Sequence, residues 1–410
     1  MNQKELEIYI HIPFCIKKCS YCDFLSAPAT EQTVESYMAA LFAEIEGKSG
    51  KYRDRRVVSV FIGGGTPSRL TGEQMGKLMA CIRRHFSLDP AAEITTEVNP
   101  GTVSEEKLRT FRKAGINRLS IGMQSAQDEE LRELGRIHDF AGFLEAYEAA
   151  VQAGYTNINV DVMSGLPGQT LESLRDTLGK LLALRPMPQH VSAYSLIVEE
   201  GTPFARMAER GELQLPEEDT ERAMYEETRE ILAKYGFHRY EISNYARDGY
   251  ECLHNVGYWI RRDYLGFGIG AASLVDNVRF QNGRDLITYL ENPQDCREEE
   301  QVLTEQEQME ETMFLGLRLI RGISYEQFEK QYDEEIGAQM TVMANNISDT
   351  RKFEVKTPQM TVKVSPEQAG LVETRMIDGV PCLVIPLTDE VEVNGIHVHL
   401  RDEEVLKNLE

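Results

Sequence analysis

Three cysteines in one short segment are the residues of this sequence best suited to do chemistry. Cys15, Cys19 and Cys22 stand within eight positions, whereas the other four of the seven cysteines are isolated along the chain. Three thiolates this close together can cap three irons of a cubane 4Fe-4S cluster. The fourth iron would then have no protein ligand, so its open position could bind a small molecule.

A single zinc ion is the alternative occupant of these thiols, with His11 or Asp23 as the fourth ligand. Zinc motifs usually consist of two paired half-sites, and the sequence has no second Cys/His pair with such spacing. Lys17, Lys18 and Ser20 are typical of a loop and poorly suited to a core, which argues against buried, inert thiols. The pattern therefore favours the cluster.

The segment that carries this motif begins a long alternation of two patterns. From residue 5 to about 200, short apolar runs alternate with stretches of helical periodicity, which is typical of βα units and a parallel sheet. The expected strands are Leu6–Ile12, Val57–Ile62, Glu93–Val98, Arg118–Met123, Asn157–Val162 and Val191–Leu196. The expected helices are Thr33–Glu46, Gly72–His85, Glu105–Ala114, Phe143–Ala153 and Leu171–Leu184. Six repeats favour a partial or complete α/β barrel, although a doubly wound open sheet has the same pattern.

Glycines and polar residues follow the ends of these predicted strands. The cysteines follow the first strand, Gly63-Gly64-Gly65-Thr66-Pro67 the second, Glu97 and Asn99 the third, Gln124 the fourth and Asp161 the fifth. Ligands of parallel α/β proteins bind at the carboxyl ends of the strands, so we expect the site there. Glycine also lets the backbone approach a ligand closely, although a glycine turn between strand and helix is a common structural device.

Two further parts are expected after this barrel core of residues 1–200. Residues 201–335 are predicted to form a mainly helical extension that includes the aromatic segment Tyr258–Phe267. Residues 336–410 are predicted to form a β-rich tail of unknown role. Its expected strands, separated by Pro, Gly and Asp turns, are Val355–Val364, Val372–Met376, Cys382–Ile385 and Val391–Leu400.

The composition excludes several classes of function. With 44 basic and 67 acidic residues, the formal charge of -23 would repel phosphate backbones, so we expect no nucleic-acid partner. No apolar run approaches the roughly 20 residues of a transmembrane helix. The first residues lack the apolar core of a signal peptide, so we expect a cytoplasmic protein.

The sequence around the cysteines resembles that of a known superfamily. CxxxCxxC after a first strand is similar to the signature of the radical S-adenosylmethionine (SAM) proteins, and Tyr-Ile-His-Ile-Pro-Phe-Cys resembles their coproporphyrinogen III oxidase-like branch, from about residue 7 to 332. The resemblance implies a (β/α)6 partial TIM barrel, with SAM on the open iron of the cluster, where an electron cleaves a C–S bond. It also implies a cofactor shell of Tyr9, Gly64, Gly65, Thr66, Glu97, Gln124, Arg136 and Asp161. The alternatives are helix caps for the acids and amides and a solvated surface charge for Arg136.

Two functions from different classes share this resemblance. One is the oxygen-independent coproporphyrinogen III oxidase, an enzyme that decarboxylates propionates of a porphyrin precursor. The other is the HemW branch of heme chaperones. The corresponding motif of the oxidases resembles CxxxCxxCxC. In this sequence Phe24 occupies the position of the last cysteine, which argues against oxidase activity. The chain also begins almost directly at the first strand, without the N-terminal extension of the oxidases.

The segment His254-Asn255-Val256-Gly257-Tyr258-Trp259 resembles the HNxxYW motif of the chaperone branch. This resemblance implies heme as a ligand, with His254 on its iron and the aromatic pair against the macrocycle. The alternative is that His254 is a hydrogen-bonded packing residue and Trp259 a core anchor. The expected partners are heme-receiving apoproteins, a reductant such as flavodoxin or ferredoxin, and a second copy in a homodimer. The tail after about residue 335 departs from the family.

Overall fold

The computed structural model describes residues 3–324, residues 328 and 332, and the backbone of six short strands between residues 353 and 398. The chain forms two compact units, Met1–Ile323 and Ser324–Glu410. The first unit contains the cysteine motif and every candidate site residue named above.

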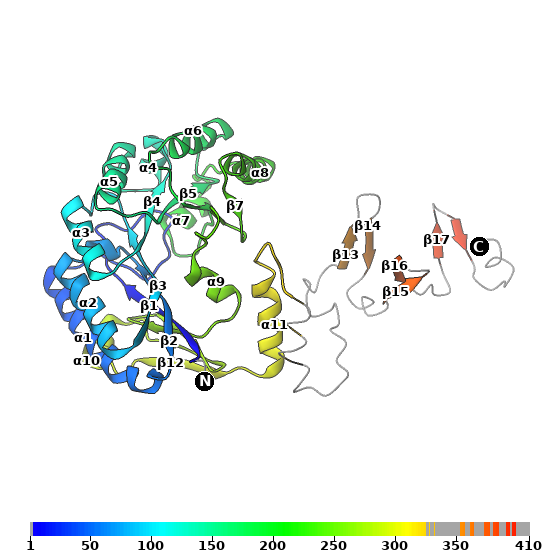
Figure 1. Ribbon diagram of the computed structural model, residues 1–410. Coiled ribbons are helices and arrows are strands. Elements are labelled where there is room, and N and C mark those ends of the chain that lie inside the picture. The colour runs from blue at the N-terminus through cyan, green and yellow to red at the C-terminus, as the bar shows by residue number, and fades with distance from the viewer. Residues whose placement is uncertain are drawn as a thin grey trace. The chain divides into compact units, whose positions relative to one another are not determined.

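Six parallel strands with intervening helices form the centre of the first unit, as predicted (Figure 1). The strands are β1 (Glu5–Ile12), β2 (Arg56–Gly64), β3 (Ser87–Val98), β4 (Arg118–Gln124), β5 (Ile158–Ser164) and β6 (His190–Ser195). The helices are α1 (Glu31–Ser49), α2 (Gly72–His85), α3 (Glu105–Ala114), α4 (Asp128–Glu133), α5 (Phe140–Gln152) and α6 (Leu171–Leu182). β3 begins at Ser87 rather than Glu93, because pairing of Ser87 and Leu88 with β2 overrides the poor strand propensity of the Asp-Pro that follows.

The six strands belong to a larger open sheet. Its order is β12-β11-β10-β9-β1-β2-β3-β4-β5-β6-β8-β7, with β9 parallel to β1 and with antiparallel strands beyond β9 and β6. Among the described residues, no pairing joins β7 to β12. The architecture is therefore a partial barrel, the fold class that the sequence predicts.

Successive side chains of β1 point alternately to the hydrophobic core and to the interior of the barrel. Leu6, Ile8 and Ile10 are fully buried in the hydrophobic core. Tyr9 and His11, on the opposite face, line a cavity. Because side chains alternate across a strand, one short segment supplies both the core and the site.

Polar caps set the ends of several outer helices. Thr71 and Thr170 each form a capping box at the start of α2 and α6, and Gly115 ends α3 in the left-handed conformation. Figure 1 shows α1, α2, α3, α5 and α6 as a layer outside the strands. Within the described part of the chain, no helix is long and apolar enough to cross a membrane.

The extension contains short strands as well as the expected helices. Its helices are α7 (Pro203–Glu209), α8 (Glu218–Lys234), α9 (Leu253–Trp259), α10 (Leu286–Glu291) and α11 (Glu305–Gly316). Its strands are β7 (His238–Arg239), β8 (Asn244–Ala246), β9 (Tyr264–Phe267), β10 (Ala272–Val275), β11 (Val278–Asn282) and β12 (Arg297–Val302). These strands are only two to six residues long, so they leave little periodic signal in the sequence.

The second unit contains three two-stranded antiparallel hairpins in the part that the structure describes. They are β13 (Phe353–Lys356) with β14 (Thr361–Val364), β15 (Glu373–Ile377) with β16 (Val380–Val384), and β17 (Val391–Val393) with β18 (Ile396–Val398). The remaining positions of the predicted tail strands, such as Val372, Ile385 and Leu400, lie outside the described residues.

A buried carboxylate ties the extension to α1. Glu44 is fully buried and accepts hydrogen bonds from Asn282 (2.6 Å), Tyr289 (2.7 Å) and the Gly268 amide (2.8 Å), and it pairs with Lys48 (2.7 Å). These partners come from the extension and from α1 itself. A hydrogen-bonded buried charge of this kind holds the elements in one arrangement.

Replacing Glu44 with Ala is expected to destabilise the chain by about 3 kcal/mol, because it leaves the partly buried Lys48 and several buried donors without their partner. The midpoint of urea unfolding, followed by circular dichroism, measures this loss. Glu46→Ala, at an exposed position of the same helix, is the matched control and should change the midpoint little. Equal effects of the two substitutions would contradict this role for Glu44.

Candidate functional site

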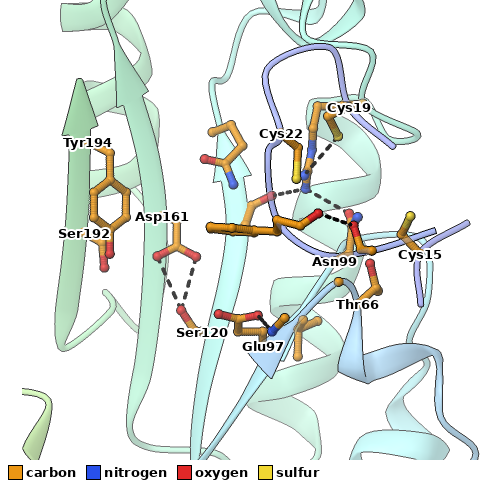
Figure 2. Close-up of a pocket in the computed structure, with 18 of the residues that line it drawn as sticks. Cys15, Cys19, Cys22, Thr66, Glu97, Asn99, Ser120, Asp161, Ser192 and Tyr194 are labelled. Carbon is orange, nitrogen blue, oxygen red and sulfur yellow. Dashed lines mark hydrogen bonds between the residues drawn. The ribbon is translucent and has the colours of Figure 1, made fainter. Parts of the chain in front are cut away.

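A cavity of about 480 Å³ lies at the carboxyl ends of the parallel strands. Apart from Tyr9 and His254, it is lined by all of the predicted site residues: Cys15, Cys19, Cys22, Gly64, Gly65, Thr66, Glu97, Gln124, Arg136 and Asp161. Figure 2 shows the cysteines on one side of this first cavity and Asp161, Ser192 and Tyr194 on the other. The arrangement can hold a ligand between thiols and carboxylates.

The cysteine loop is held by backbone hydrogen bonds. The Cys15 amide donates to the Ala27 carbonyl (3.2 Å), and the Ser20 amide donates to the Leu134 carbonyl (3.0 Å). Arg136 Nη1 lies 3.8 Å from the sulfur of Cys19, so a cation faces the thiols. Burial raises the pKa of the Cys15 and Cys22 thiols.

His11 does not join the cysteines as a zinc ligand would. Its Nε2 is 2.8 Å from the Leu25 carbonyl, and its Nδ1 is 3.0 Å from the Tyr9 hydroxyl. Among the described residues, no group of three or more His, Cys, Asp or Glu side chains, the three cysteines included, is arranged to hold a single metal ion. Three thiols without a fourth protein donor fit a cluster with one open iron better than a closed tetrahedral zinc site.

The turn after β2 requires glycine. Gly64 has a φ of 112°, and a Cβ added there would lie 2.7 Å from the His11 ring. A Cβ on Gly65 would lie 2.9 Å from the Phe14 carbonyl oxygen. The bare backbone therefore forms the cavity wall here, and the Gly64 amide donates to Glu97 Oε2 (3.1 Å).

Glu97 is half-buried, lines the cavity and lies next to the glycine turn. Burial and the nearby Asp161 raise the pKa of Glu97 to about 8, against a smaller opposing effect of the Gly64 hydrogen bond. Its carboxyl group is therefore mostly protonated near neutral pH. It can donate a hydrogen bond to a ligand as well as accept one.

Asp161 and Arg136 are both held by polar neighbours. Asp161 accepts hydrogen bonds from Asn159 (2.7 Å) and Ser120 (3.1 Å), and burial raises its pKa. Arg136 Nη2 donates to the Asn99 side chain (2.9 Å) and the Gly122 carbonyl (3.0 Å). Arg136 is half-buried in the cavity wall and is therefore not the solvated surface charge of the alternative interpretation.

Several lining residues were not singled out from the sequence. They are Tyr21, Arg118, Ser120, Ser192 and Tyr194. Arg118 and Ser120 are two positions apart on β4, as are Ser192 and Tyr194 on β6, so each pair shares one face of its strand. Polar residues at alternate positions of a predicted barrel strand are a signal that could have identified these four.

A second cavity, of about 700 Å³, adjoins the first and shares Phe24, Gly64 and Glu97 with it. Tyr9 lines this second cavity, not the first. The other lining residues come mainly from β1, α9 and β9–β11: His11, Asp23, Leu25, Tyr258, Trp259, Tyr264, Gly270, Ala272, Leu274, Arg279, Gln281, Arg284 and Leu315.

His254 lines neither cavity. Its Nδ1 is hydrogen-bonded to Ser59 (2.8 Å) and its Nε2 to the Tyr258 hydroxyl (3.0 Å), while its ring stacks on Phe61 with centroids 5.2 Å apart. Burial and two nearby arginines lower its pKa to about 3, so the imidazole is neutral. In this arrangement both ring nitrogens are occupied, as in the packing alternative, whereas Tyr258 and Trp259 face the second cavity.

Known proteins resemble the chain over most of its length. Residues 9–181 match the model of the radical SAM superfamily. The chain is 37% identical over 350 residues to heme chaperone HemW of Lactococcus lactis (84% of this chain, 91% of the relative). It is 40% identical over 335 residues to heme chaperone HemW of Bacillus subtilis (80% and 87%). The chain belongs to the HemW family.

The fold of this family extends to a solved enzyme. Coproporphyrinogen III oxidase (HemN) from Escherichia coli aligns with a TM-score of 0.71 at 24% identity, covering 90% of this chain and 88% of that one. At this identity the likeness shows the fold alone. A second family model, a domain of unknown function (DUF4317), matches residues 280–396, which include β12 and the hairpins β13–β14 and β15–β16.

Membership of the radical SAM superfamily implies a 4Fe-4S cluster and SAM. The first cavity fits both, because three thiols line one wall and polar groups line the opposite one. When bound, the pair supplies reductive cleavage of a sulfonium. The protein residues would hold the irons through Cys15, Cys19 and Cys22 and orient the nucleoside through polar groups.

The raised pKa of Glu97 predicts a pH dependence of stability. The carboxyl ionises near 4.5 in the unfolded chain but only near 8 in the folded chain, so its stabilising contribution is complete below pH 4.5 and is lost as pH rises toward 8. Glu97→Gln should therefore reduce the loss of stability of the apoprotein over this range, by at least about 1 kcal/mol. Unfolding midpoints in urea between pH 5 and 8 measure this difference.

Glu106→Gln, at an exposed position of α3, is the control and should keep the wild-type pH dependence. An unchanged pH dependence in Glu97→Gln would mean that Glu97 is ionised in the folded chain.

Proposed function

We propose that this protein is a cytoplasmic heme chaperone that binds heme and delivers it to recipient apoproteins. It holds a 4Fe-4S cluster through Cys15, Cys19 and Cys22, and it binds SAM in the first cavity. The observation that carries the proposal is the 37–40% identity to proteins named heme chaperone HemW over 80–84% of the chain.

The shell of the first cavity supports a SAM site. The bare backbone at Gly64 and Gly65 and the buried Thr66 suit the amino group of the methionine part, next to the iron. Arg136 supplies a cation for a carboxylate. Asp161, held by Asn159 and Ser120, and Gln124 supply acceptors for hydroxyl or amino groups of the nucleoside.

Coproporphyrinogen III oxidase is the alternative function. Phe24 occupies the position of the cysteine that follows the cluster motif in the oxidases, and it is 60% exposed and lines both cavities. An apolar ring there cannot serve as a redox or acid–base group. A reductant such as flavodoxin or ferredoxin remains part of the proposal, since cluster reduction needs an electron donor. The homodimer also remains a proposal.

The reconstituted full chain is expected to bind ferric heme and to leave coproporphyrinogen III unchanged, because Phe24 provides none of the chemistry of a cysteine. Heme binding is followed by the Soret band, and turnover is assayed anaerobically with reductant and SAM. The oxidase from E. coli, assayed in parallel, is the positive control. Robust decarboxylation by this chain would defeat the chaperone proposal.

Anaerobic reconstitution is expected to give about four irons and four sulfides per chain, and the electron paramagnetic resonance signal of the reduced cluster should change when SAM is added. Cys19→Ala should lose most of this iron. Cys81→Ala, a half-buried thiol of α2, should retain it. A chain that carries one zinc ion and no inorganic sulfide would overturn the cluster assignment.

A further inference from the structure

The wall of the first cavity follows β4 over its whole length. Gln124, at the carboxyl end of the strand, lines the cavity, and so do Ser120 and Arg118 toward its amino end. Because a strand rises about 3.3 Å per residue, the backbone of Arg118 is roughly 20 Å from that of Gln124. The glycine turn and Gln124, which we assign to SAM, belong to the carboxyl end. Arg118 therefore belongs to an inner part of the cavity that the proposed SAM contacts leave unassigned.

Arg118 is buried without the hydrogen bonds that a buried guanidinium normally has. The residue is 2% exposed, and its Nε has no hydrogen-bond partner among the described residues. The ion pair that it forms with Glu93 is long, at 3.9 Å. Buried donors in proteins almost always have acceptors, because an unsatisfied one is costly. A guanidinium also stays charged at any physiological pH, so Arg118 favours an acceptor from outside the chain.

The two carboxylates nearest to Arg118 already accept hydrogen bonds from other groups. Glu93 accepts from the first two backbone amides of α9 (3.2 and 3.3 Å). Asp161 accepts from Asn159 (2.7 Å) and Ser120 (3.1 Å). Their lone pairs are therefore directed largely at these donors, and the guanidinium remains available to a ligand of the cavity.

Two further donors line the same cavity from other elements. Asn255 lies on α9 and is half-buried, and Tyr194 lies on β6 and is 40% exposed. The protein around the phenol raises the pKa of Tyr194, so its hydroxyl stays protonated and can donate. Figure 2 shows Tyr194 beside Ser192, on the side of the cavity opposite the cysteines.

A hydrogen-bonded asparagine connects the strands behind these donors. The Asn159 side chain donates to Ser120 of β4 (2.7 Å) and accepts from Ser192 of β6 (3.1 Å). All three side chains are buried. This network fixes the spacing between β4 and β6, so the inner wall is already formed before a ligand binds.

The size and the remaining lining of the cavity restrict the ligand. Its volume of about 480 Å³ is toward the lower end of the roughly 300–1,000 Å³ of small-molecule sites, and the candidate SAM site takes part of it. Phe61, Val98 and Met163 add apolar surface. Two coplanar oxygens match the fork of a guanidinium, whereas a doubly charged phosphate would be repelled by Glu93 and Asp161. The ligand that fits is a small apolar molecule with one carboxylate.

We propose that the inner part of the first cavity binds the carboxylate of a short aliphatic acid, with Arg118 as its bidentate partner and Asn255 and Tyr194 as further donors. This ligand is additional to the cluster, the SAM and the heme of the proposed function. The site also gives Asn255 a role that differs from that of its neighbours in the HNxxYW segment, since Tyr258 and Trp259 line the second cavity.

Butyrate and butyramide test this site, because they have nearly the same shape but only butyrate carries a carboxylate. Each is titrated into the reconstituted full-length protein with SAM present, and broadening of its methyl NMR signal measures binding. Wild type should bind butyrate at least about tenfold more tightly than butyramide. Equal affinities for the two, or no binding of butyrate, would overturn the proposal.

Arg118→Lys keeps the charge but loses the forked geometry, so it should weaken butyrate binding about tenfold. Arg55→Lys is the matched control, because Arg55 is also buried but pairs with Asp263 and Asp276 outside both cavities. This control should keep the wild-type affinity for butyrate. The same butyrate affinity in Arg118→Lys as in Arg55→Lys would exclude Arg118 from the site.

Asn255→Ala replaces Arg118→Lys as the deciding variant if the latter fails to fold. Loss of one donor to a carboxylate should weaken butyrate binding about fivefold, and an unchanged affinity would contradict the proposal. The effect of SAM on the electron paramagnetic resonance signal is recorded on the same samples. A signal that changes with SAM in a protein that does not bind butyrate would remove this site and leave the proposed function standing. A signal that SAM leaves unchanged would count against the proposed function, whereas butyrate binding in that sample would still support this site.

Discussion

The contact between Glu93 and the start of α9 fixes the wall between the two cavities. Glu93, buried on β3, accepts hydrogen bonds from the backbone amides of Leu253 (3.2 Å) and His254 (3.3 Å). The buried guanidinium of Arg118 lies 3.9 Å away. A carboxylate at the first turn of a helix satisfies free amides and the helix dipole, so the barrel itself determines where the HNxxYW residues lie.

Much of this arrangement follows from local sequence patterns. The alternation of apolar runs predicts the six parallel strands, and the residues at their carboxyl ends come together because parallel strands end at one edge of a sheet. Cys15, Gly64, Glu97 and Asp161 are close in space for that reason alone. The positions of these four residues could be predicted without knowing which side chains surround them.

What depends on contacts between distant segments could not be predicted in the same way. His254 is held by Ser59 and stacks on Phe61, which precede it by almost two hundred residues, so its neighbours could not be known from its own segment. Tyr9 faces the second cavity because β9 and α9 continue the sheet and the wall beyond β1. Strands as short as β9 carry too little periodicity to indicate this.

The shared wall of the cavities has a thermodynamic consequence. Gly64 and Glu97 border both spaces, so an occupant of either one changes the hydrogen-bonding surface offered to the other. By linkage, any such influence on affinity is equal in both directions. Occupancy of one cavity and the ligand affinity of the other are then two measures of one coupling free energy, carried by the residues that both cavities share.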